Sequence, residues 1–292
     1  MNRPIGVFDS GLGGLTVVKA FLRHLPEEPI VYFGDTARVP YGTKSKETIT
    51  RFSGEIIRFL KKHDVKMIVI ACHTASALAL DAVIAEFPGL PILGVVDPAS
   101  RKAVEMSKTK RIGVIGTRST ISSGSFERAI YGLEPDARVF SAACPLFVPL
   151  VEEGWAAGGV ADKEVVDRVI HKYIDPLAKE QIDSLILGCT HYPILAERIA
   201  SALPAGVSLV DPAEETALSA RFVLKELGLA VTPAAAAGPA ASGSFGAQAG
   251  PSPKLKCFVS DDALSFKRLG EVFLGSGIPS VERVVDEEFQ TA

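Results

Sequence analysis

The chain has 292 residues, of which 47% are hydrophobic, and its formal net charge at pH 7 is −3. This length is enough for two domains of ordinary size, and the apolar share is enough for a substantial core. Lysine and arginine are in no excess, which argues against nucleic acid or an acidic membrane surface as a partner. We therefore expect a protein that handles a small molecule.

The N-terminal sequence and the cysteines bear on where the protein works. MNRPIGVFDSG reaches a glycine-rich loop too early for an export signal. No window approaches the run of about 18 apolar residues that a membrane span needs. Cys72, Cys144, Cys189 and Cys257 are widely spaced, which favours reduced thiols over a disulfide framework. We expect a cytoplasmic protein with no membrane partner.

Short apolar runs alternate along the chain with stretches in which apolar residues recur every three or four positions. The runs predict strands at 5–9, 30–33, 67–71, 91–96, 112–116, 138–142, 184–188, 207–210 and 257–261. The periodic stretches predict helices at 16–25, 45–63, 73–83, 162–180, 190–203, 212–227 and 264–275. Strands without polar alternation suit a sheet covered on both faces, with helical crossovers between parallel strands. We predict an α/β fold with mainly parallel sheets.

Three short motifs occur twice in the same order, which indicates one structural plan used twice. The pairs are IGVFDSGLGG with IGVIGTRSTISSG, VIACHTA with LILGCTH, and GVVDPAS with SLVDPAE. This repetition predicts two similar lobes related by a pseudo-twofold axis, with equivalent strand ends facing one cleft. Ligands of such sheets bind beyond the carboxyl ends of the strands, where Cys72 and Cys189 lie.

Residues 231–256 break this pattern, because they are rich in Ala, Gly, Pro and Ser and carry almost no charge. Such a composition buries too little apolar surface to offset the entropy of ordering the chain. We expect a flexible surface insertion at this point.

Cys72 and Cys189 each stand where a buried strand is expected to end and a helix to begin. The unpaired N–H groups and the positive end of a helix favour a thiolate. Two opposed thiols suit stereochemical work, in which one removes a proton from a carbon and the other returns a proton to the opposite face. The alternative is a pair of inert core cysteines.

Two loops offer further polar groups. DSGLGG (9–14) lacks the third glycine of a dinucleotide motif and the ending of a P-loop, so it predicts a tight turn that presents Asp9 and Ser10. Asp9 is a candidate for holding an ammonium group or orienting a base, or else a helix N-cap. GDTARVPYG (34–42) brings Asp35, Arg38 and Tyr41 together, either as donors for a carboxylate or as ordinary turn chemistry.

Other side chains at or after strand ends complete the expected site. Hydroxyl groups that suit an amino-acid carboxylate come from Ser10, Thr74, Thr117, Thr120 and Thr190. His191 follows Cys189 by two positions and is placed to assist a thiol. Glu152 is a candidate cleft carboxylate, although a solvated helix start explains it equally well.

These motifs together resemble the glutamate racemase family, whose members interconvert the enantiomers of glutamate without a cofactor and supply D-glutamate for peptidoglycan. The resemblance covers nearly the whole chain outside 231–256. It is carried by FDSGLGGLTV, GDTARVPYG, the cysteine motif before TASA, PLFVPLVEEG, GCTHYP and VDPAEETA. It implies two α/β lobes with the active site between them, a first lobe formed by 1–97 and 211–292, and a second formed by 98–210. It also implies an enzyme that binds glutamate and that can assemble as a homodimer.

Carried over by position, the resemblance implies that Cys72 and Cys189 are the catalytic acid–bases and that Asp9 and His191 assist them. The implied substrate contacts are Ser10, Tyr41, Gly42, Thr74 and Thr190. Further candidate contacts, which the resemblance does not itself supply, are Asp9, His73, Thr117, Thr120, Glu152 and His191. The family carries Asn where this chain has His73. A histidine can still donate a hydrogen bond, but it is bulkier and can be charged, so substrate preference or turnover could differ.

Three other interpretations stay open. The chain could be a related racemase that acts on aspartate or another acidic substrate. It could be a metal enzyme with ligands Cys72, His73, Cys189 and His191, although the spacing lacks a metal-binding motif. It could also be a non-catalytic, two-lobed amino-acid-binding protein, which would leave the paired thiols without a role.

Overall fold

The computed structural model describes residues 3–231 and 255–285, and all its strand pairs are parallel. The strands of the larger sheet, in spatial order, are β10 (Val281–Arg283), β9 (Leu255–Val259), β2 (Ile30–Gly34), β1 (Ile5–Asp9), β3 (Met67–Ile70) and β4 (Ile92–Gly94). Those of the smaller sheet are β6 (Arg138–Ala143), β5 (Arg111–Gly116), β7 (Ser184–Gly188) and β8 (Ser208–Val210). The predicted α/β fold with mainly parallel sheets is confirmed.

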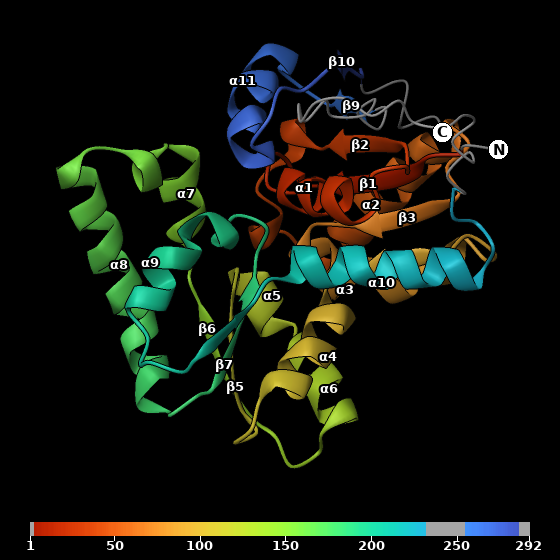
Figure 1. Cartoon of the computed structure of the whole chain (residues 1–292). Coiled ribbons are helices and arrows are strands. Elements are labelled where there is room, and N and C mark those ends of the chain that lie inside the picture. The colour runs from red at the N-terminus through yellow and green to blue at the C-terminus, as the bar shows by residue number, and fades with distance from the viewer. Residues whose placement is uncertain (1–2, 232–254, 286–292) are drawn as a thin grey trace, which may run out of the picture.

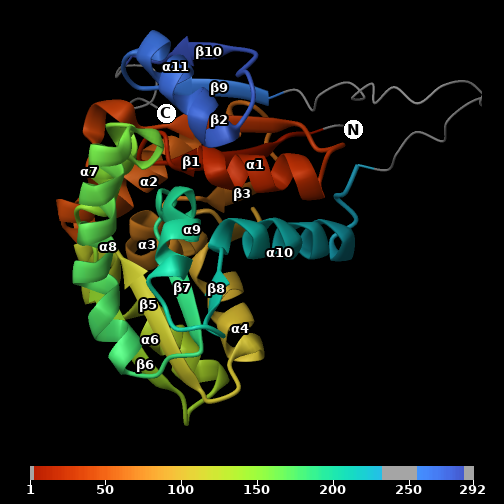
Figure 2. The same cartoon turned by 60° about the vertical axis from the view of Figure 1, so that its left-hand side comes forward.

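Helices connect these strands. The α-helices are α1 (Leu15–His24), α2 (Lys46–Lys61), α3 (His73–Glu86), α4 (Val96–Met106), α5 (Arg118–Ser122), α6 (Ser125–Leu133), α7 (Phe147–Glu152), α8 (Val160–Lys179), α9 (Ala196–Ser201), α10 (Pro212–Glu226) and α11 (Ala263–Leu274). Short 3₁₀ turns are η1 (Thr36–Arg38), η2 (Tyr41–Thr43), η3 (Trp155–Ala157) and η4 (Tyr192–Leu195). Figures 1 and 2 show the two sheets in separate lobes, with α10 running between them.

The two sheets repeat one strand order. In the larger sheet the first four strands lie as β2-β1-β3-β4, and in the smaller sheet the four strands lie as β6-β5-β7-β8. In each lobe, therefore, the second strand lies beside the first, and the third and fourth follow on the other side. Strands β3 and β7 are equivalent in this plan, so the residues that follow them occupy equivalent places.

The larger sheet is buried on both faces, as its uninterrupted apolar strands predict. Val7 of β1 packs with Phe21 of α1 on one face, whereas Phe8 packs with Ile56 of α2 on the other. Neighbouring residues of a strand point to opposite faces, so each strand contributes to two apolar clusters. The chain therefore has no polar face along these central strands, and polar groups gather at the strand ends instead.

Several predicted boundaries differ from the structure by a few residues, and two of the differences have a clear local cause. The strand expected at 91–96 ends at Gly94, because Asp97 and Pro98 suit the first turn of α4. The helix expected at 190–203 is instead the short 3₁₀ turn η4 followed by six-residue α9, with Pro193 at the start of the turn. The edge strand β10 was not predicted, since three residues leave almost no periodic signal.

The sheets draw on separate parts of the chain. The larger uses strands up to Gly94 and from Leu255 onward, and the smaller uses strands between Arg111 and Val210. The division into lobes at 97/98 and 210/211 stays a prediction. Of the expected insertion at 231–256, residues 232–254 lie outside those described. No helix within 3–231 or 255–285 is long and apolar enough to cross a membrane.

A buried ion pair fixes the chain where it leaves α10. The Lys66 and Glu28 side chains are ion-paired and only 2% and 4% exposed. The Lys66 Nζ also donates to the Leu229 carbonyl at 2.7 Å, and Glu28 Oε1 accepts from the Val231 N–H at 2.8 Å. The pair thus ties residues 229–231 to the segments that lead into β2 and β3 of the larger sheet.

We expect Lys66→Met to lower the free energy of unfolding by about 3 kcal/mol, because the substitution leaves the Glu28 carboxylate buried without its cation. Adding Glu28→Gln should recover part of this loss. Urea unfolding measures both values. The control is Lys102→Met, which breaks the exposed Lys102–Glu105 pair and should cost less than about 1 kcal/mol. A similarly small loss for Lys66→Met would contradict the role of the buried pair.

Candidate active site

The two candidate cysteines stand at equivalent places in the two lobes. Cys72 follows β3 and is the N-cap of α3, and Cys189 follows β7 directly. Both residues are buried, with Cys72 only 5% exposed and Cys189 only 6% exposed. The repeated strand order therefore delivers one buried thiol from each lobe to the carboxyl end of its sheet.

The carboxyl ends of the two sheets meet through side-chain hydrogen bonds. The Thr74 hydroxyl, after β3, lies 3.0 Å from the Thr117 hydroxyl and 3.4 Å from the Thr120 hydroxyl, both after β5. The Ser119 hydroxyl donates to the Gly42 carbonyl at 2.7 Å. A cluster of hydroxyl groups contributed by both lobes thus lies beside Cys72, which immediately precedes α3.

A second set of contacts joins the lobes on the Cys189 side. The Thr16 hydroxyl donates to the Thr190 carbonyl at 3.1 Å. The backbone of Gly13 approaches so closely that a Cβ there would lie 2.2 Å from Thr190 Oγ1 and 2.6 Å from the His191 ring. Only glycine fits this position, because any side chain would push the Thr190–His191 segment away. The glycine-rich loop therefore serves close packing between the lobes.

Asp9 lies buried at the end of β1. Its Oδ2 accepts from the Gly11 N–H at 3.0 Å, whereas its Oδ1 is buried with no hydrogen-bond partner among the described residues. Burial raises the pKa of this carboxyl. Gly14, and not Asp9, is the N-cap of α1, so the alternative role of Asp9 as a helix cap is wrong.

Cys72 is a protonated thiol in the free protein. Its Sγ lies 3.7 Å from the Ser10 hydroxyl. Burial, and then the negative charge of Asp9, raise the pKa of Cys72 to about 12. The prediction that the helix end favours a Cys72 thiolate is therefore wrong for this state, because the loss of hydration outweighs the N–H groups of α3. Cys189 also raises this pKa, which places both thiols in one electrostatic neighbourhood.

His191 is positively charged at neutral pH and lies beside Cys189. Its Nδ1 is 3.8 Å from the Cys189 sulfur, and its Nε2 is 2.9 Å from Glu152 Oε1. Burial lowers the pKa of His191, but the hydrogen bonds to Cys189 and Glu152 outweigh burial and raise the pKa to about 10. The ring of Phe273 packs edge-on against the ring of His191, and the two ring centroids are 5.3 Å apart. Glu152 is half-exposed, so it links this buried histidine to the surface.

His73 lies buried at the start of α3 and is neutral. Both of its ring nitrogens have no hydrogen-bond partner within the described ranges. Its ring is stacked on the ring of Phe126 from the other lobe, and the two ring centroids are 6.3 Å apart. Burial, together with the charge of His191, lowers the pKa of His73 to about 3. A neutral imidazole carries one N–H donor and one acceptor nitrogen, and neither is paired within the described residues.

The loop at 34–42 uses its polar side chains internally. The Tyr41 hydroxyl donates to Asp35, and the Arg38 guanidinium is ion-paired with Asp35 at 2.7 Å. The Ser260 hydroxyl donates to the other Asp35 oxygen at 2.9 Å. The hypothesis that the Arg38 and Tyr41 side chains serve as open donors is therefore wrong. The network instead holds Gly42 against Thr117.

The structure brings nearly all the predicted residues to one junction. Asp9, Ser10, Cys72 and Thr74 come from the first lobe, and the residues from the second are Thr117, Thr120, Glu152, Cys189, Thr190 and His191. Sequence reasoning missed Thr16, Ser119 and Phe273, which contact Thr190, Gly42 and His191 respectively. A hydroxyl or a ring in a helix carries no signal of such a contact. None of the described residues form a cluster of three or more side chains that could hold a metal ion.

Comparisons with known proteins agree with this geometry. Residues 6–220 match the model of the Asp/Glu/Hydantoin racemase family. The glutamate racemase of Geobacter metallireducens is 43% identical over 97% of this chain and 96% of its own length.

Two solved structures cover 97% of both chains. They are glutamate racemase isoform RacE1 from Bacillus anthracis (38% identity, TM-score 0.85) and glutamate racemase from Francisella tularensis in complex with D-glutamate (37% identity, TM-score 0.83). The match spans both lobes and the segments that carry both cysteines. The chain therefore belongs to the Asp/Glu/Hydantoin racemase family.

Proposed function

We propose that this protein interconverts L- and D-glutamate by transferring protons at the α-carbon. The observation that carries the proposal is the pair of buried thiols at the ends of equivalent strands, one from each lobe. A carbon held between them loses its proton to one sulfur and gains a proton from the other on the opposite face. The names of relatives that share 43% of their residues support glutamate as the substrate.

The polar groups around the thiols suit an α-amino acid. The partnerless oxygen of Asp9 would accept from the substrate ammonium. The hydroxyls of Thr74, Thr117 and Thr120 would donate to a carboxylate, and Ser10 and Thr190 lie beside the two thiols. Burial strengthens each of these interactions, because water no longer screens the charges. These groups would hold the charges on either side of the reacting carbon.

The two thiols have different surroundings, which assigns them different roles at the start of a turnover. The His191 imidazolium, 3.8 Å from the Cys189 sulfur, stabilises negative charge there. Cys72 has a raised pKa and holds its proton. In one direction Cys189 would therefore abstract the α-proton while Cys72 donates one, and the return reaction reverses these roles. Glu152 keeps His191 charged during this exchange.

The wider role is also a proposal. The D-glutamate formed would supply peptidoglycan synthesis. Four free cysteines, including both candidate acid–bases, suit a reducing compartment, which supports a cytoplasmic location. Assembly as a homodimer stays a prediction.

Cys72→Ser and Cys189→Ser should each lower kcat for racemisation by about 10²–10⁴-fold, because each removes one of the two groups that transfer protons. Proton NMR of L-glutamate in D₂O follows the loss of the α-proton, and chiral chromatography follows the product. The matched control is Cys257→Ala, at a buried cysteine of β9 outside the site. Normal turnover in either serine variant would contradict the two-thiol mechanism.

Glu152→Gln should lower the pKa of His191 by on the order of one unit, because it removes a negative charge that favours the imidazolium. Glu152 raises the pKa of His191 and so keeps the ring protonated up to higher pH. Without this carboxylate, the alkaline limb of the kcat/KM pH profile should move to lower pH. The pH–rate profile and nitrogen NMR of the ring measure this shift. Glu153→Gln is the control at the exposed neighbouring position, and equal alkaline limbs for the two variants would overturn the role of Glu152.

His73→Phe tests whether the histidine contacts substrate, because it keeps a ring and removes the nitrogens. The nitrogens have no protein partner within the described residues, so the free energy of unfolding of the ligand-free protein should not fall. KM for glutamate should rise about tenfold, the equivalent of one lost hydrogen bond. His63→Phe, at a ring outside the site, is the control. A less stable protein with an unchanged KM would assign His73 a structural role only.

A further inference from the structure

The carboxylate that keeps His191 charged stands in a half-exposed position. The Glu152 side chain is 45% exposed, whereas the His191 side chain is 8% exposed. An exposed carboxylate that is free to turn contributes little to an ion pair, because water screens its charge and ordering it costs entropy. The position of α7, whose last residue is Glu152, therefore decides how strongly this carboxylate acts on the ring.

Helix α7 does not hold this position by itself. It has only six residues, whereas isolated helices shorter than about 12 residues are marginal in water. Its N-cap is Leu146, whose apolar side chain cannot accept a hydrogen bond from the first turn. Contacts with the rest of the second lobe therefore fix the helix.

Tyr192 provides the contact at the start of α7. Its hydroxyl donates to the Cys144 carbonyl at 2.9 Å, and the same carbonyl accepts from the Phe147 N–H at 3.2 Å. The Tyr192 ring packs edge-on against the Phe147 ring, and the two ring centroids are 5.1 Å apart. These three residues are fully buried. Because Tyr192 directly follows His191, one short segment carries the ring and also holds the helix of its partner.

The Tyr192 hydroxyl stays a hydrogen-bond donor while His191 titrates. Burial raises the pKa of Tyr192 well above the ordinary value for a tyrosine, and the neighbouring Cys189 and Cys144 raise it further. The hydroxyl therefore keeps its proton over the pH range in which His191 loses its charge. The contact with the Cys144 carbonyl persists over the same range.

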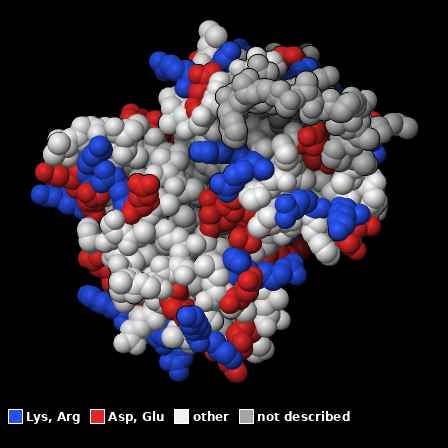
Figure 3. All heavy atoms as spheres, in the orientation of Figure 1, with Lys and Arg blue, Asp and Glu red and all other residues white. Residues whose placement is uncertain are grey.

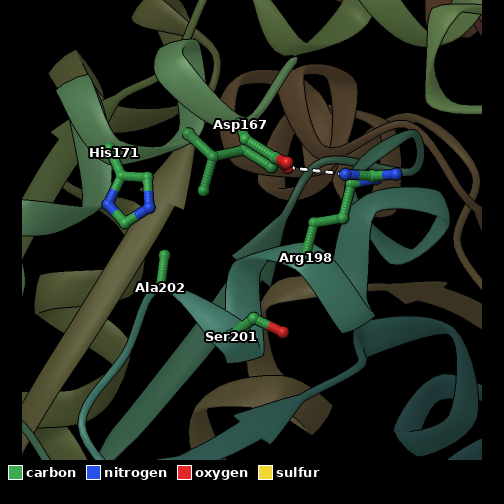
Figure 4. A pocket seen from close by; sticks show the side chains of 6 residues that line it. Asp167, His171, Arg198, Ser201 and Ala202 are labelled. Atoms are coloured by element: carbon green, nitrogen blue, oxygen red, sulfur yellow. Dashed lines mark hydrogen bonds and ion pairs between the residues drawn. The ribbon is translucent and has the colours of Figure 1, made fainter. Parts of the chain in front are cut away.

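Helices α8 and α9 hold α7 from the other side. The ring of Tyr173, in α8, packs edge-on against Phe147, and the two ring centroids are 5.4 Å apart. Figure 4 shows Arg198 of α9 paired with Asp167 of α8, at 2.6 Å. Helix α9 directly follows η4, which begins at Tyr192. The chain after Tyr192 therefore also fixes the helix that packs on Phe147.

Glu152 has no evident substitute on the visible surface nearby. The hydrogen bonds and charges of Cys189 and Glu152 are what raise the pKa of His191. Figure 3 shows acidic and basic atoms intermixed at the left of the molecule, where α8 lies in Figure 1. This face over α8 carries no patch of one sign that could replace the charge of Glu152.

We propose that Tyr192 is a positioning residue for the Glu152–His191 pair. The Tyr192 hydroxyl fixes the start of α7, and α7 holds Glu152 where its carboxylate keeps the ring charged. The charged ring in turn stabilises negative charge on the Cys189 sulfur, 3.8 Å away. The effect of Tyr192 on turnover rests on the proposed function, whereas its effect on the charge of His191 does not.

Tyr192→Phe tests this role, because it removes only the hydroxyl and keeps the ring. We expect the pKa of His191, measured by nitrogen NMR of the full chain, to fall by roughly 0.5 unit, because Glu152 is held less firmly. The alkaline limb of the kcat/KM pH profile should move to lower pH by the same amount. At pH values below that limb, kcat should change less than about twofold. An unchanged pKa in a folded Tyr192→Phe protein would overturn the proposal.

The sharpest comparison uses the Glu152→Gln background. If Tyr192 acts through Glu152, adding Tyr192→Phe to Glu152→Gln should shift the pKa of His191 no further, because the two changes remove the same interaction. Equal shifts in the presence and absence of Glu152 would mean that the hydroxyl affects the ring by another route. That result would refute the positioning role.

Two further variants separate positioning from stability. Ile56→Val, in the buried core of the first lobe, should lower the urea midpoint of unfolding and leave the pKa of His191 unchanged. Phe147→Leu removes the ring that packs on Tyr192 and should lower this pKa, so the test does not depend on one variant. A shift in Ile56→Val as large as that in Tyr192→Phe would contradict the proposal.

The NMR measurement also separates this proposal from the proposed function. If the chain proves inactive on glutamate, the ring signals of His191 in Tyr192→Phe and Glu152→Gln still decide the role of Tyr192. If the chain is active and these signals do not move, only the role of Tyr192 fails.

Discussion

The parallel pairing of β1 with β3 and of β5 with β7 is the constraint on which the rest of the molecule depends. Parallel strands end at the same edge of a sheet, so Asp9 and Cys72 leave the larger sheet together, and Thr117 and Cys189 leave the smaller sheet together. The two edges then meet through the hydrogen bonds of Thr74 and Thr16 with the opposite lobe. A site with one thiol from each side follows from this topology, without any special local motif.

The meeting of the two lobes also buries the site, and burial changes the pKa of each titratable group in a different way. It raises the pKa of Asp9 and Cys72 and lowers the pKa of His73, so these groups resist carrying charge. His191 alone gains a charge at neutral pH, because Glu152 and Cys189 outweigh its burial. A fixed positive charge beside one thiol, and a protonated thiol opposite, give the site a polarity before substrate arrives. A zwitterionic substrate would add its own charges to this arrangement.

Much of this architecture could be predicted from the sequence, because it follows from local patterns. Apolar runs marked the central strands, and the repeated motifs placed Cys72 and Cys189 at equivalent ends. The prediction of one helix at 190–203 was wrong because Pro193 and its neighbours form a 3₁₀ turn. The spacing of apolar residues does not distinguish such a turn from an α-helix. The roles of Arg38 and Tyr41 were wrong because both side chains pair with Asp35. Ser260, which holds the other oxygen of Asp35, follows β9 far along the chain. The pKa of Cys72 was wrong because burial of a strand end depends on how the two lobes pack.

Two residues that contact the segment after Cys189 show the same limit. Thr16 and Phe273 stand in ordinary amphipathic helices, and nothing in their own neighbourhoods marks them as contacts of Thr190 and His191. Their significance comes from the approach of α1 and α11 to the Cys189 segment. Close packing at Gly13 fixes that approach, since a Cβ there would collide with both residues.

The most direct test of two opposed thiols is the isotope content of both enantiomers early in the reaction of L-glutamate in D₂O. With one thiol on each face, the proton removed is not the one returned. The first D-glutamate formed should then carry deuterium at the α-carbon, while the remaining L-glutamate still carries hydrogen. D-glutamate that retains the original hydrogen would mean that a single group removes and returns the proton, and would contradict the account.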